Sequence, residues 1–508
     1  MSTRRNAFLA LVPSLTCLLA APSSALQSLR ERARAALGGT NDGAPLEGRG
    51  KAHAGGLDGV HRVVLAGDGR FRFELDTALP EGAAFDGKCV WTSDHAGLQR
   101  VVAMEEADRA KVFAWVLSGH WSTARELDVR ELQPENDVRP RLELALRDTP
   151  MVMTLTLDAK TLLPAELFYA DPSNTVTWTF ADFGAAGGRQ LPRRWELDSE
   201  ELHETYEVEA WKPLARSEGV FDAKLAPVRD VRFDPDEGAE LEVERVMSGH
   251  LLVEPFVEGK SVGAFIFDTG AGAMTIDPKV ADALGLPKLG EVAAVGIGGR
   301  TSASFRKGKR FELGPLTLSD PVYVELDLAF LEPVFGRKIA GIVGYDLLAR
   351  CVAEIETRTP YVALHDPAKF ELAGAAWQEL VLNENTPCVH ARFEGDHEGL
   401  FRVDTGANGT VAFHAPAVRE LGLLDGRSVN ASLSGGVGGS ADTRSGPLAW
   451  FELAGHRFEK PTVEFSLAEQ GAFTDRYTVG NIAQDFLAPF RLVLDYPDDR
   501  MAFVELAK

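Results

Sequence analysis

The chain has 508 residues, of which 45% are hydrophobic and 25% charged, values that are ordinary for globular proteins and exclude a disordered or collagen-like chain. At roughly 100–200 residues per domain, this length predicts about three domains. The 53 Lys and Arg residues against 75 Asp and Glu residues give a net charge of −22. Such an acidic surface repels phosphate backbones and anionic headgroups, which argues against nucleic acid and membrane surfaces as partners.

The first 25 residues have the three-part pattern of a secretory signal peptide. Two arginines near the start precede an apolar segment over 7–21, and Ser23-Ser24-Ala25 offers small residues for cleavage. The apolar segment is too short to span a bilayer stably, and the residues before Cys17 fit a lipoprotein signal poorly. No run of 18 apolar residues follows. We therefore expect a secreted or periplasmic protein with no integral membrane segment after removal of the signal.

Cysteine and histidine patterns predict neither a disulfide scaffold nor a metal site. Beyond the signal peptide the cysteines are Cys89, Cys351 and Cys388, an odd number without a CxxC pair. A Cys351–Cys388 bridge stays open in an oxidising compartment. The 11 histidines are scattered, without an HExxH motif, and the chain has no GxSxG nucleophile elbow. We predict no metal and no cofactor.

Residues 26–213 are expected to form an N-terminal accessory domain, followed by a linker over 214–240. Alternating apolar and polar residues predict an antiparallel sheet with one buried face, preceded by a polar, Gly-rich stretch over 39–59. The expected helices are 26–38 and 105–117, and the clearest strands are 61–66, 70–76, 151–158, 175–180 and 204–211. This order of helix and meander resembles the half-open barrel of bacterial lipoprotein-carrier proteins, which implies an α+β half-barrel-like domain.

From about residue 241 the chain repeats itself. FIFDTGAGAMTID at 265–277 corresponds to FRVDTGANGTVAF at 401–413. Four further elements follow in both copies in the same order and at nearly constant spacing: LGL, a glycine cluster, FELG or FELA, and GIVGYDLL or GNIAQDFL. The repeat predicts two β-rich lobes, the first lobe over 241–370 and the second lobe over 371–508. We expect them to pack as a pseudo-dimer within a monomeric chain.

Each copy carries Asp-Thr-Gly at the end of an apolar strand. The tripeptide alone is weak evidence, because Asp and Gly also make ordinary tight turns. Here both copies continue with Ala and occupy the same place in the repeat. On these residues the region over 241–508 resembles the pepsin/retropepsin superfamily of aspartic proteases, and its DTGA form is similar to the bacterial retropepsin-like members. The resemblance implies a mainly β fold with two tandem retropepsin-like lobes, each supplying one catalytic aspartate, Asp268 and Asp404.

The resemblance also assigns supporting roles to the neighbours of the two aspartates. Thr269 and Thr405 would hydrogen-bond across the lobe junction. Gly270 and Gly406 would let backbone N–H groups approach the carboxylates closely.

Two neighbouring carboxyl groups suit peptide hydrolysis. Held about 3 Å apart, they cannot both ionise and share one proton. The ionised group then acts as general base on a water molecule, while the protonated group hydrogen-bonds the substrate carbonyl oxygen. The pair titrates as a unit, so the sequence assigns the shared proton to neither residue. The expected function is that of an aspartic-type endopeptidase acting on a peptide or protein substrate.

The second lobe departs from the family pattern at three places. In the family a later loop carries two apolar residues and Gly, which are Ile342-Val343-Gly344 in the first lobe but Asn481-Ile482-Ala483 in the second. Arg402 stands where the first lobe has Ile266. These differences keep open a second interpretation, a non-catalytic peptide- or lipid-binding protein that retains the fold.

The glycine clusters of the two copies are candidate flaps over a cleft, with ordinary hairpin turns as the alternative. A phosphate-loop interpretation fails because Thr301 and Ala441 occupy the third glycine position of GxGxxG. Mobile hairpins could close over an extended peptide and exclude water. The candidate flap residues are Gly296, Gly298, Gly299, Gly436, Gly438 and Gly439.

The sequence leaves several questions open. The N-terminal domain could be a pro-segment that blocks the cleft, a recognition domain, or a carrier of an apolar or lipid ligand that holds the main function. Substrate preference and pH optimum are not predicted. Asp346 and Asp485, which recur in both copies, are expected to be structural helix caps.

Overall fold

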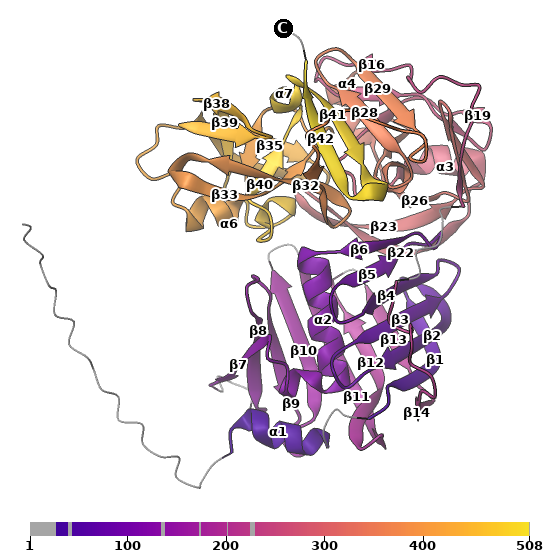
Figure 1. The fold of residues 1–508 in the computed structure, drawn as a ribbon, viewed down its shortest axis with the longest axis vertical. Helices are drawn as coiled ribbons and strands as arrows, with labels where there is room; N and C mark the ends of the chain where they lie inside the picture. Colours follow the sequence, from indigo (N-terminus) through magenta and orange to yellow (C-terminus); the bar gives the residue numbers. More distant parts are fainter. Residues whose placement is uncertain are drawn as a thin grey trace, which may run out of the picture.

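The structure is a computed structural model that describes residues 27–506 except 39–42, 134–137, 172–173, 201 and 224–228. The predicted signal peptide and part of the predicted linker lie outside the described residues. The fold is mainly β, as predicted, and the N-terminal domain lies below the C-terminal lobes in Figure 1. No helix among the described residues is both long enough and apolar enough to cross a membrane.

The N-terminal domain is one large antiparallel sheet with a helix on it. Its helical elements are α1 (Leu29–Leu37), α2 (Met104–Ser118) and the 3-10 helix η1 (His120–Ser122). Its strands are β1 (Leu46–Ala54), β2 (Leu57–Leu65), β3 (Phe71–Asp76), β4 (Glu81–Phe85), β5 (Val90–Ser93), β6 (Gln99–Val102), β7 (Leu127–Leu132), β8 (Arg141–Leu146), β9 (Val152–Leu157), β10 (Pro164–Asp171), β11 (Asn174–Ala186), β12 (Arg189–Asp198), β13 (His203–Glu207) and β14 (Ala210–Pro213). The strand order is β6-β5-β4-β3-β2-β1-β13-β12-β11-β10-β9-β8-β7, with β14 on β1.

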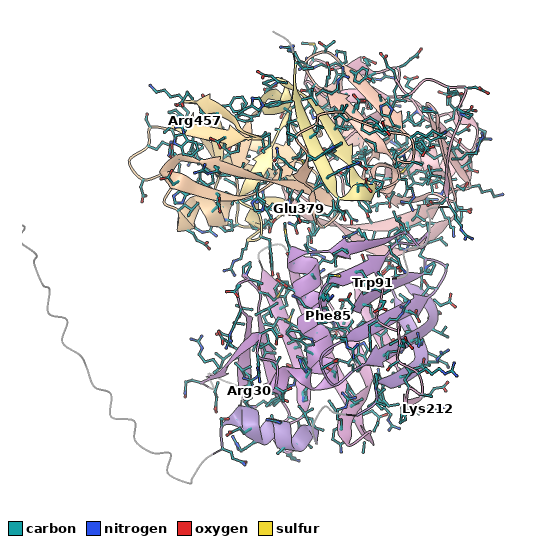
Figure 2. All side chains as sticks on the ribbon, viewed as in Figure 1. Arg30, Phe85, Trp91, Lys212, Glu379 and Arg457 are labelled. Atoms are coloured by element: carbon teal, nitrogen blue, oxygen red, sulfur yellow. The ribbon has the colours of Figure 1, made fainter. Side chains whose placement is uncertain are left out.

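Helix α2 packs on this sheet through its apolar side chains. Acidic residues in its first turn suit the positive end of the helix dipole, and Gly119 ends it in a left-handed conformation. Phe113 of the helix lies 5.3 Å from Trp178 and 5.8 Å from Phe73, measured between ring centroids. These aromatic side chains belong to a core that is separate from that of the lobes. Figure 2 shows Trp91 inside this domain and Lys212 at its surface.

Strand β1 lies within the polar, Gly-rich stretch over 39–59, for which no strand was predicted. Its glycines allow close packing against the chain between β13 and β14. A Cβ at Gly48 would lie 2.8 Å from Val208 Cγ1, and one at Gly50 would lie 1.7 Å from Glu207 O. Residues 46–54 therefore form a strand because of tertiary packing, although their composition disfavours strand formation.

The elements of the first lobe repeat in the second. Those preceding and within the first lobe are β15 (Val231–Phe233), β16 (Glu244–Arg245), β17 (Leu251–Val253), β18 (Phe256–Val257), β19 (Lys260–Ser261), β20 (Phe265–Phe267), β21 (Thr275–Ile276), α3 (Pro278–Leu284), β22 (Lys288–Gly296), β23 (Gly299–Lys307), β24 (Arg310–Leu313), β25 (Leu316–Ser319), β26 (Val322–Glu325), η2 (Ala329–Leu331), α4 (Glu332–Phe335), β27 (Gly341–Val343), α5 (Tyr345–Leu348), β28 (Val352–Glu356) and β29 (Tyr361–His365).

Those of the second lobe are β30 (Gln378–Glu379), β31 (Val381–Asn383), β32 (Thr386–Phe393), η3 (Glu394–Asp396), β33 (His397–Val403), β34 (Val411–Phe413), α6 (Ala415–Glu420), β35 (Asn430–Gly436), β36 (Gly439–Pro447), β37 (Trp450–Leu453), β38 (His456–Glu459), β39 (Thr462–Ser466), η4 (Ala472–Thr474), β40 (Gly480–Ile482), α7 (Gln484–Leu487), β41 (Phe490–Asp495), η5 (Tyr496–Asp498) and β42 (Arg500–Glu505).

Strand pairing shows the repeat in three dimensions. The first-lobe order β17-β20-β27-β21-β26-β23-β22 corresponds to β32-β33-β40-β34-β39-β36-β35 in the second lobe. In each lobe the strand before Asp-Thr-Gly pairs in parallel with the later apolar strand, β20 with β27 and β33 with β40. A further sheet, β29-β28-β41-β42-β30, contains strands of both lobes, and one hydrophobic core runs through both.

The N-terminal domain contacts both lobes. Arg350 Nη2 donates to Asp94 of the N-terminal domain at 2.8 Å, and Tyr477 of the second lobe donates to Asp108 of α2 at 3.1 Å. The predicted linker contains β15, which pairs with β25 of the first lobe. Leu98 of the domain also packs against the core of the lobes, so polar and apolar contacts both contribute to this interface.

Candidate active site

Both Asp-Thr-Gly turns are held by the same backbone bonds. The Asp268 N–H donates to Val343 O and the Asp404 N–H to Ile482 O, each at 3.0 Å. Each aspartate thus stands at the end of a strand that is fixed by its parallel neighbour.

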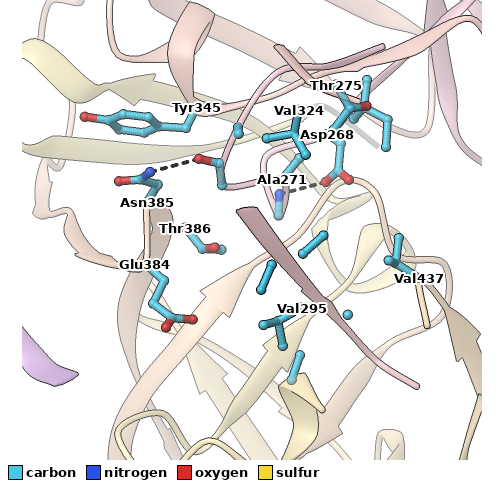
Figure 3. Close-up of a pocket in the computed structure, with 18 of the residues that line it drawn as sticks. Asp268, Ala271, Thr275, Val295, Val324, Tyr345, Glu384, Asn385, Thr386 and Val437 are labelled. Carbon is cyan, nitrogen blue, oxygen red and sulfur yellow. Dashed lines mark hydrogen bonds between the residues drawn. The ribbon is translucent and has the colours of Figure 1, made fainter. Parts of the chain in front are cut away.

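The two aspartates meet across the junction of the lobes. Their carboxyl groups are hydrogen-bonded to each other, and each also accepts from its own turn, Asp268 from Gly270 N at 2.7 Å and Asp404 from Gly406 N at 2.9 Å. Figure 3 shows Asp268 with this backbone donor at the cavity. We call Asp268 and Asp404 the Asp pair.

Glycine is required after each threonine because the two turns approach so closely. A Cβ at Gly270 would lie 2.5 Å from Asp404 Cγ, and one at Gly406 would lie 2.1 Å from Asp268 Cγ. Each glycine therefore makes room for the carboxyl group of the other lobe.

Thr269 and Thr405 lock the two turns together in a reciprocal arrangement. Each backbone N–H donates to the hydroxyl oxygen of the other threonine at 3.0 Å. The hydroxyls in turn donate across the junction, Thr269 to Val403 O at 2.7 Å and Thr405 to Phe267 O at 3.2 Å. Both threonines are completely buried, so each donor and acceptor needs its partner. The structure thus places the predicted supporting residues next to the Asp pair: Thr269, Gly270, Thr405 and Gly406.

Burial and mutual repulsion shape the titration of the Asp pair. Burial raises the pKa of Asp268 well above its ordinary value, and the negative charge of Asp404 raises it further. Burial also raises the pKa of Asp404, but the Gly406 N–H and the charge of Arg402 oppose this rise. The surroundings therefore favour the proton on Asp268.

The predicted flap glycines lie at the tips of two hairpins, β22–β23 and β35–β36, and these tips touch. The Gly298 N–H donates to Val437 O at 3.0 Å. A Cβ at Gly298 would lie 2.2 Å from Gly439 N, and Gly438 and Gly439 have φ of +80° and +126°. The remaining predicted glycines lie at the same contact: Gly296, Gly299 and Gly436.

A cavity of about 1460 Å³ includes the Asp pair and extends beyond it. Its lining includes both hairpin tips and continues into the N-terminal domain, where it reaches the half-buried Phe113 and the buried Trp178 and Trp195. The cleft of the lobes and the space beside the N-terminal sheet thus form one continuous cavity.

Two further turns, which were not predicted from the sequence, support the Asp pair from the opposite lobe. His250 Nε2 donates to Gly406 O and Asn385 Nδ2 donates to Gly272 O, both at 2.9 Å. Figure 3 shows the second of these bonds. The available signal was a polar residue just before β17 and just before β32, the strands that pair with the two Asp-Thr-Gly strands.

Ala483 does not disturb the second turn. It is buried, and the bond from Gln484 N to Ala407 O at 3.1 Å matches that from Tyr345 N to Ala271 O at 3.0 Å in the first lobe. The alanine is therefore compatible with the same backbone arrangement.

Asp346 and Asp485 were predicted to cap helices, and this prediction is wrong. The capping positions of α5 and α7 belong to Gly344 and Ala483. Asp346 instead accepts from Met274 N at 2.6 Å, just after the first Asp-Thr-Gly loop. Its role is still structural, but it ties the later helix to that loop.

Comparison with known proteins gives one family match. A family described as aspartyl protease matches residues 253–347, which include Asp268 and end before the second Asp-Thr-Gly. No curated protein matches the chain. Among solved structures, a LolA superfamily protein from Nitrosomonas europaea is 13% identical, with a TM-score of 0.30, over 39% of this chain and 97% of that one. This TM-score is too low to support a conclusion, so the lipoprotein-carrier resemblance stays a prediction.

Proposed function

We propose that the chain is an aspartic-type endopeptidase that hydrolyses peptide bonds with a water molecule activated between Asp268 and Asp404. The observation that carries this proposal is the contact of the two carboxyl groups at the ends of matched, interlocked turns. The aspartyl protease match around Asp268 supports it. The sharing of one proton supplies a base and an acid at the same site.

The flap tips complete the proposed cleft. An extended peptide lies between the Asp pair and the two hairpins, where strand-like backbone bonds hold it in place. Opening of the tips admits the substrate, and their closure excludes bulk water from the reacting atoms. Because one chain supplies both aspartates, we propose that the monomer is active.

Cleavage of an unfolded protein mixture at several pH values tests this function. Asp268→Asn and Asp404→Asn are each expected to abolish cleavage, because each lobe gives half of one site. Asp320→Asn, at an exposed turn of the first lobe, is the matched control and should retain full activity. Full activity in either variant of the Asp pair would refute the proposal.

A second candidate function concerns the N-terminal domain. The aromatic lining by Phe113, Trp178 and Trp195 favours binding of an apolar group, as in the carrier or non-catalytic interpretation. Quenching of tryptophan fluorescence by an apolar probe measures such binding, and Trp195→Ala should weaken it. If this variant loses probe binding but cleaves unfolded protein normally, the binding role is separate from catalysis.

We also propose that the protein acts outside the cytoplasm. The signal-peptide pattern over 1–25 carries this proposal. The mass of the exported protein should correspond to a chain that begins near Leu26, and retention of the full-length chain in the cytoplasm would contradict it.

A further inference from the structure

The second lobe holds a chain of buried polar side chains beside its aspartate. In the first lobe the register partners on β20 and β27 are Ile266 and Ile342. At the matching places, β33 and β40 pair Arg402 with Asn481, which are only 9% and 8% exposed. Burying such polar groups is unfavourable unless they are hydrogen-bonded, so their partners indicate their role.

Asn481 connects Asp404 to His414. Its Nδ2 donates to Asp404 Oδ2 at 3.3 Å, and its Oδ1 lies 2.9 Å from His414 Nε2. An amide that turns an N–H group toward a carboxylate presents its oxygen to the histidine, and this arrangement requires the N–H of a neutral His414 ring on Nε2. Burial, together with the charge of Arg402, lowers the pKa of His414 to about 4. The ring is therefore neutral above that pH.

The chain continues from His414 to an ion pair. His414 Nδ1 lies 3.1 Å from the hydroxyl oxygen of Thr478 and 3.2 Å from its backbone oxygen, and this hydroxyl donates its proton to Asp475. Asp475 accepts from Arg402 Nη2 and from Asn383 Nδ2, both at 2.8 Å. The Arg402 and Asp475 side chains are only 11% and 7% exposed. A buried pair with this many bonds is fixed in place.

Arg402 acts on the Asp pair through its charge. It lies on β33, which ends just before Asp404, and its charge holds the pKa of that carboxyl below the value that burial alone would give. The first lobe has only Ile266 at this position. The ionisable groups that line the cavity around Asp404 come from both lobes: Asp268, His250, Glu384, Arg402, Glu464 and Asp475.

We infer that Arg402, Asn481 and His414 are positioning residues that make the two aspartates unequal. They hold Asp404 as the carboxylate that receives a proton from water, and they leave the shared proton on Asp268. This inference rests on the proposed function and assigns the two roles within it.

The assignment gives a balanced reaction. The water oxygen bonds to the carbonyl carbon, the water proton passes to Asp404, and Asp268 gives its proton to the carbonyl oxygen. The C–N bond then breaks, the proton on Asp404 goes to the leaving nitrogen, and a hydroxyl of the intermediate returns a proton to Asp268. The pair ends in its starting state.

The pH profile of kcat/KM for a peptide substrate tests the inference. Asn481→Ile introduces the residue of the first lobe and removes a donor to Asp404, so the base gains a proton more readily. The acid limb should move up by about half to one pH unit. Ile342→Val, a comparable change beside Asp268, should leave the acid limb in place.

His414 gives an independent second comparison. His414→Gln keeps a side-chain N–H donor and should retain the wild-type acid limb, whereas His414→Phe should shift it upward like Asn481→Ile. A purely structural role would lower kcat/KM by the same factor at every pH. Unmoved acid limbs in both Asn481→Ile and His414→Phe overturn the inference. Cleavage by Asp268→Asn or Asp404→Asn would instead overturn the proposed function.

Discussion

The two lobes share one backbone plan and differ in the side chains that flank their aspartates. Ile266 and Ile342 flank the aspartate of the first lobe, whereas Arg402 and Asn481 flank that of the second. The backbone bonds that hold the turns are the same in both. Duplication can therefore preserve the position of two carboxyl groups while their electrostatic surroundings diverge, because the turns depend on main-chain bonds and glycines.

Arg402→Ile removes the largest of these differences and should have the largest effect. Asp475 would remain buried without its cation, which typically costs about 3–5 kcal/mol of stability at neutral pH. Urea unfolding measures this loss. Ile266→Val, the matched control in the first lobe, should cost only about 0.5–1.5 kcal/mol. Equal losses in the two variants would show that the ion pair contributes no more than packing.

The effect of Arg402→Ile should depend on pH. Burial favours the neutral form of Asp475, but the charge of Arg402 prevails and lowers the pKa of that carboxyl. A carboxyl with a lowered pKa in the folded state contributes stability that is present above its unfolded pKa of about 3.9 and is lost as pH falls through the folded value. The difference between variant and wild type should therefore shrink below about pH 4.

The difference in pKa between the two aspartates should also appear in the stability of the protein when either one is replaced by asparagine. A carboxyl whose folded pKa is raised destabilises the fold increasingly as pH rises above its unfolded pKa, because the folded state holds the proton longer. Asp268→Asn should therefore stabilise the protein at pH 7, and stabilise it less at pH 4. Burial raises the pKa of Asp268 well above its ordinary value, while Arg402 and the Gly406 N–H oppose the rise at Asp404.

Thermal unfolding of Asp268→Asn and Asp404→Asn at pH 7 measures which substitution stabilises the protein more. Asp404→Asn should stabilise the protein less than Asp268→Asn at pH 7. Equal stabilisation would mean that the surroundings of the second lobe do not distinguish the aspartates.

The Asp pair and the hairpin tips could be predicted because the repeat places short, distinctive motifs at equivalent positions. The polar chain beside Asp404 could not. Arg402 and Asn481 were visible only as departures from the first lobe, and His414 and Asp475 look like surface residues in the sequence. They meet through parallel pairing of β33 with β40 and through the loop after η4. Strand β1 was not predicted for a related reason. Its glycines are explained by close packing against the chain after β13, which the sequence does not show, and glycine has a low strand propensity.

The smallest expected effect concerns the contact between the hairpin tips, to which both lobes contribute. Gly298→Ala places a methyl group 2.2 Å from Gly439 N, so the tips must separate. Because closure holds the substrate without taking part in proton transfer, KM should rise several-fold while kcat changes little. Gly435→Ala, where nothing lies within 4 Å, is the matched control on the other hairpin and should match wild type. A fall in kcat with an unchanged KM would mean that the tips act on the reacting groups themselves.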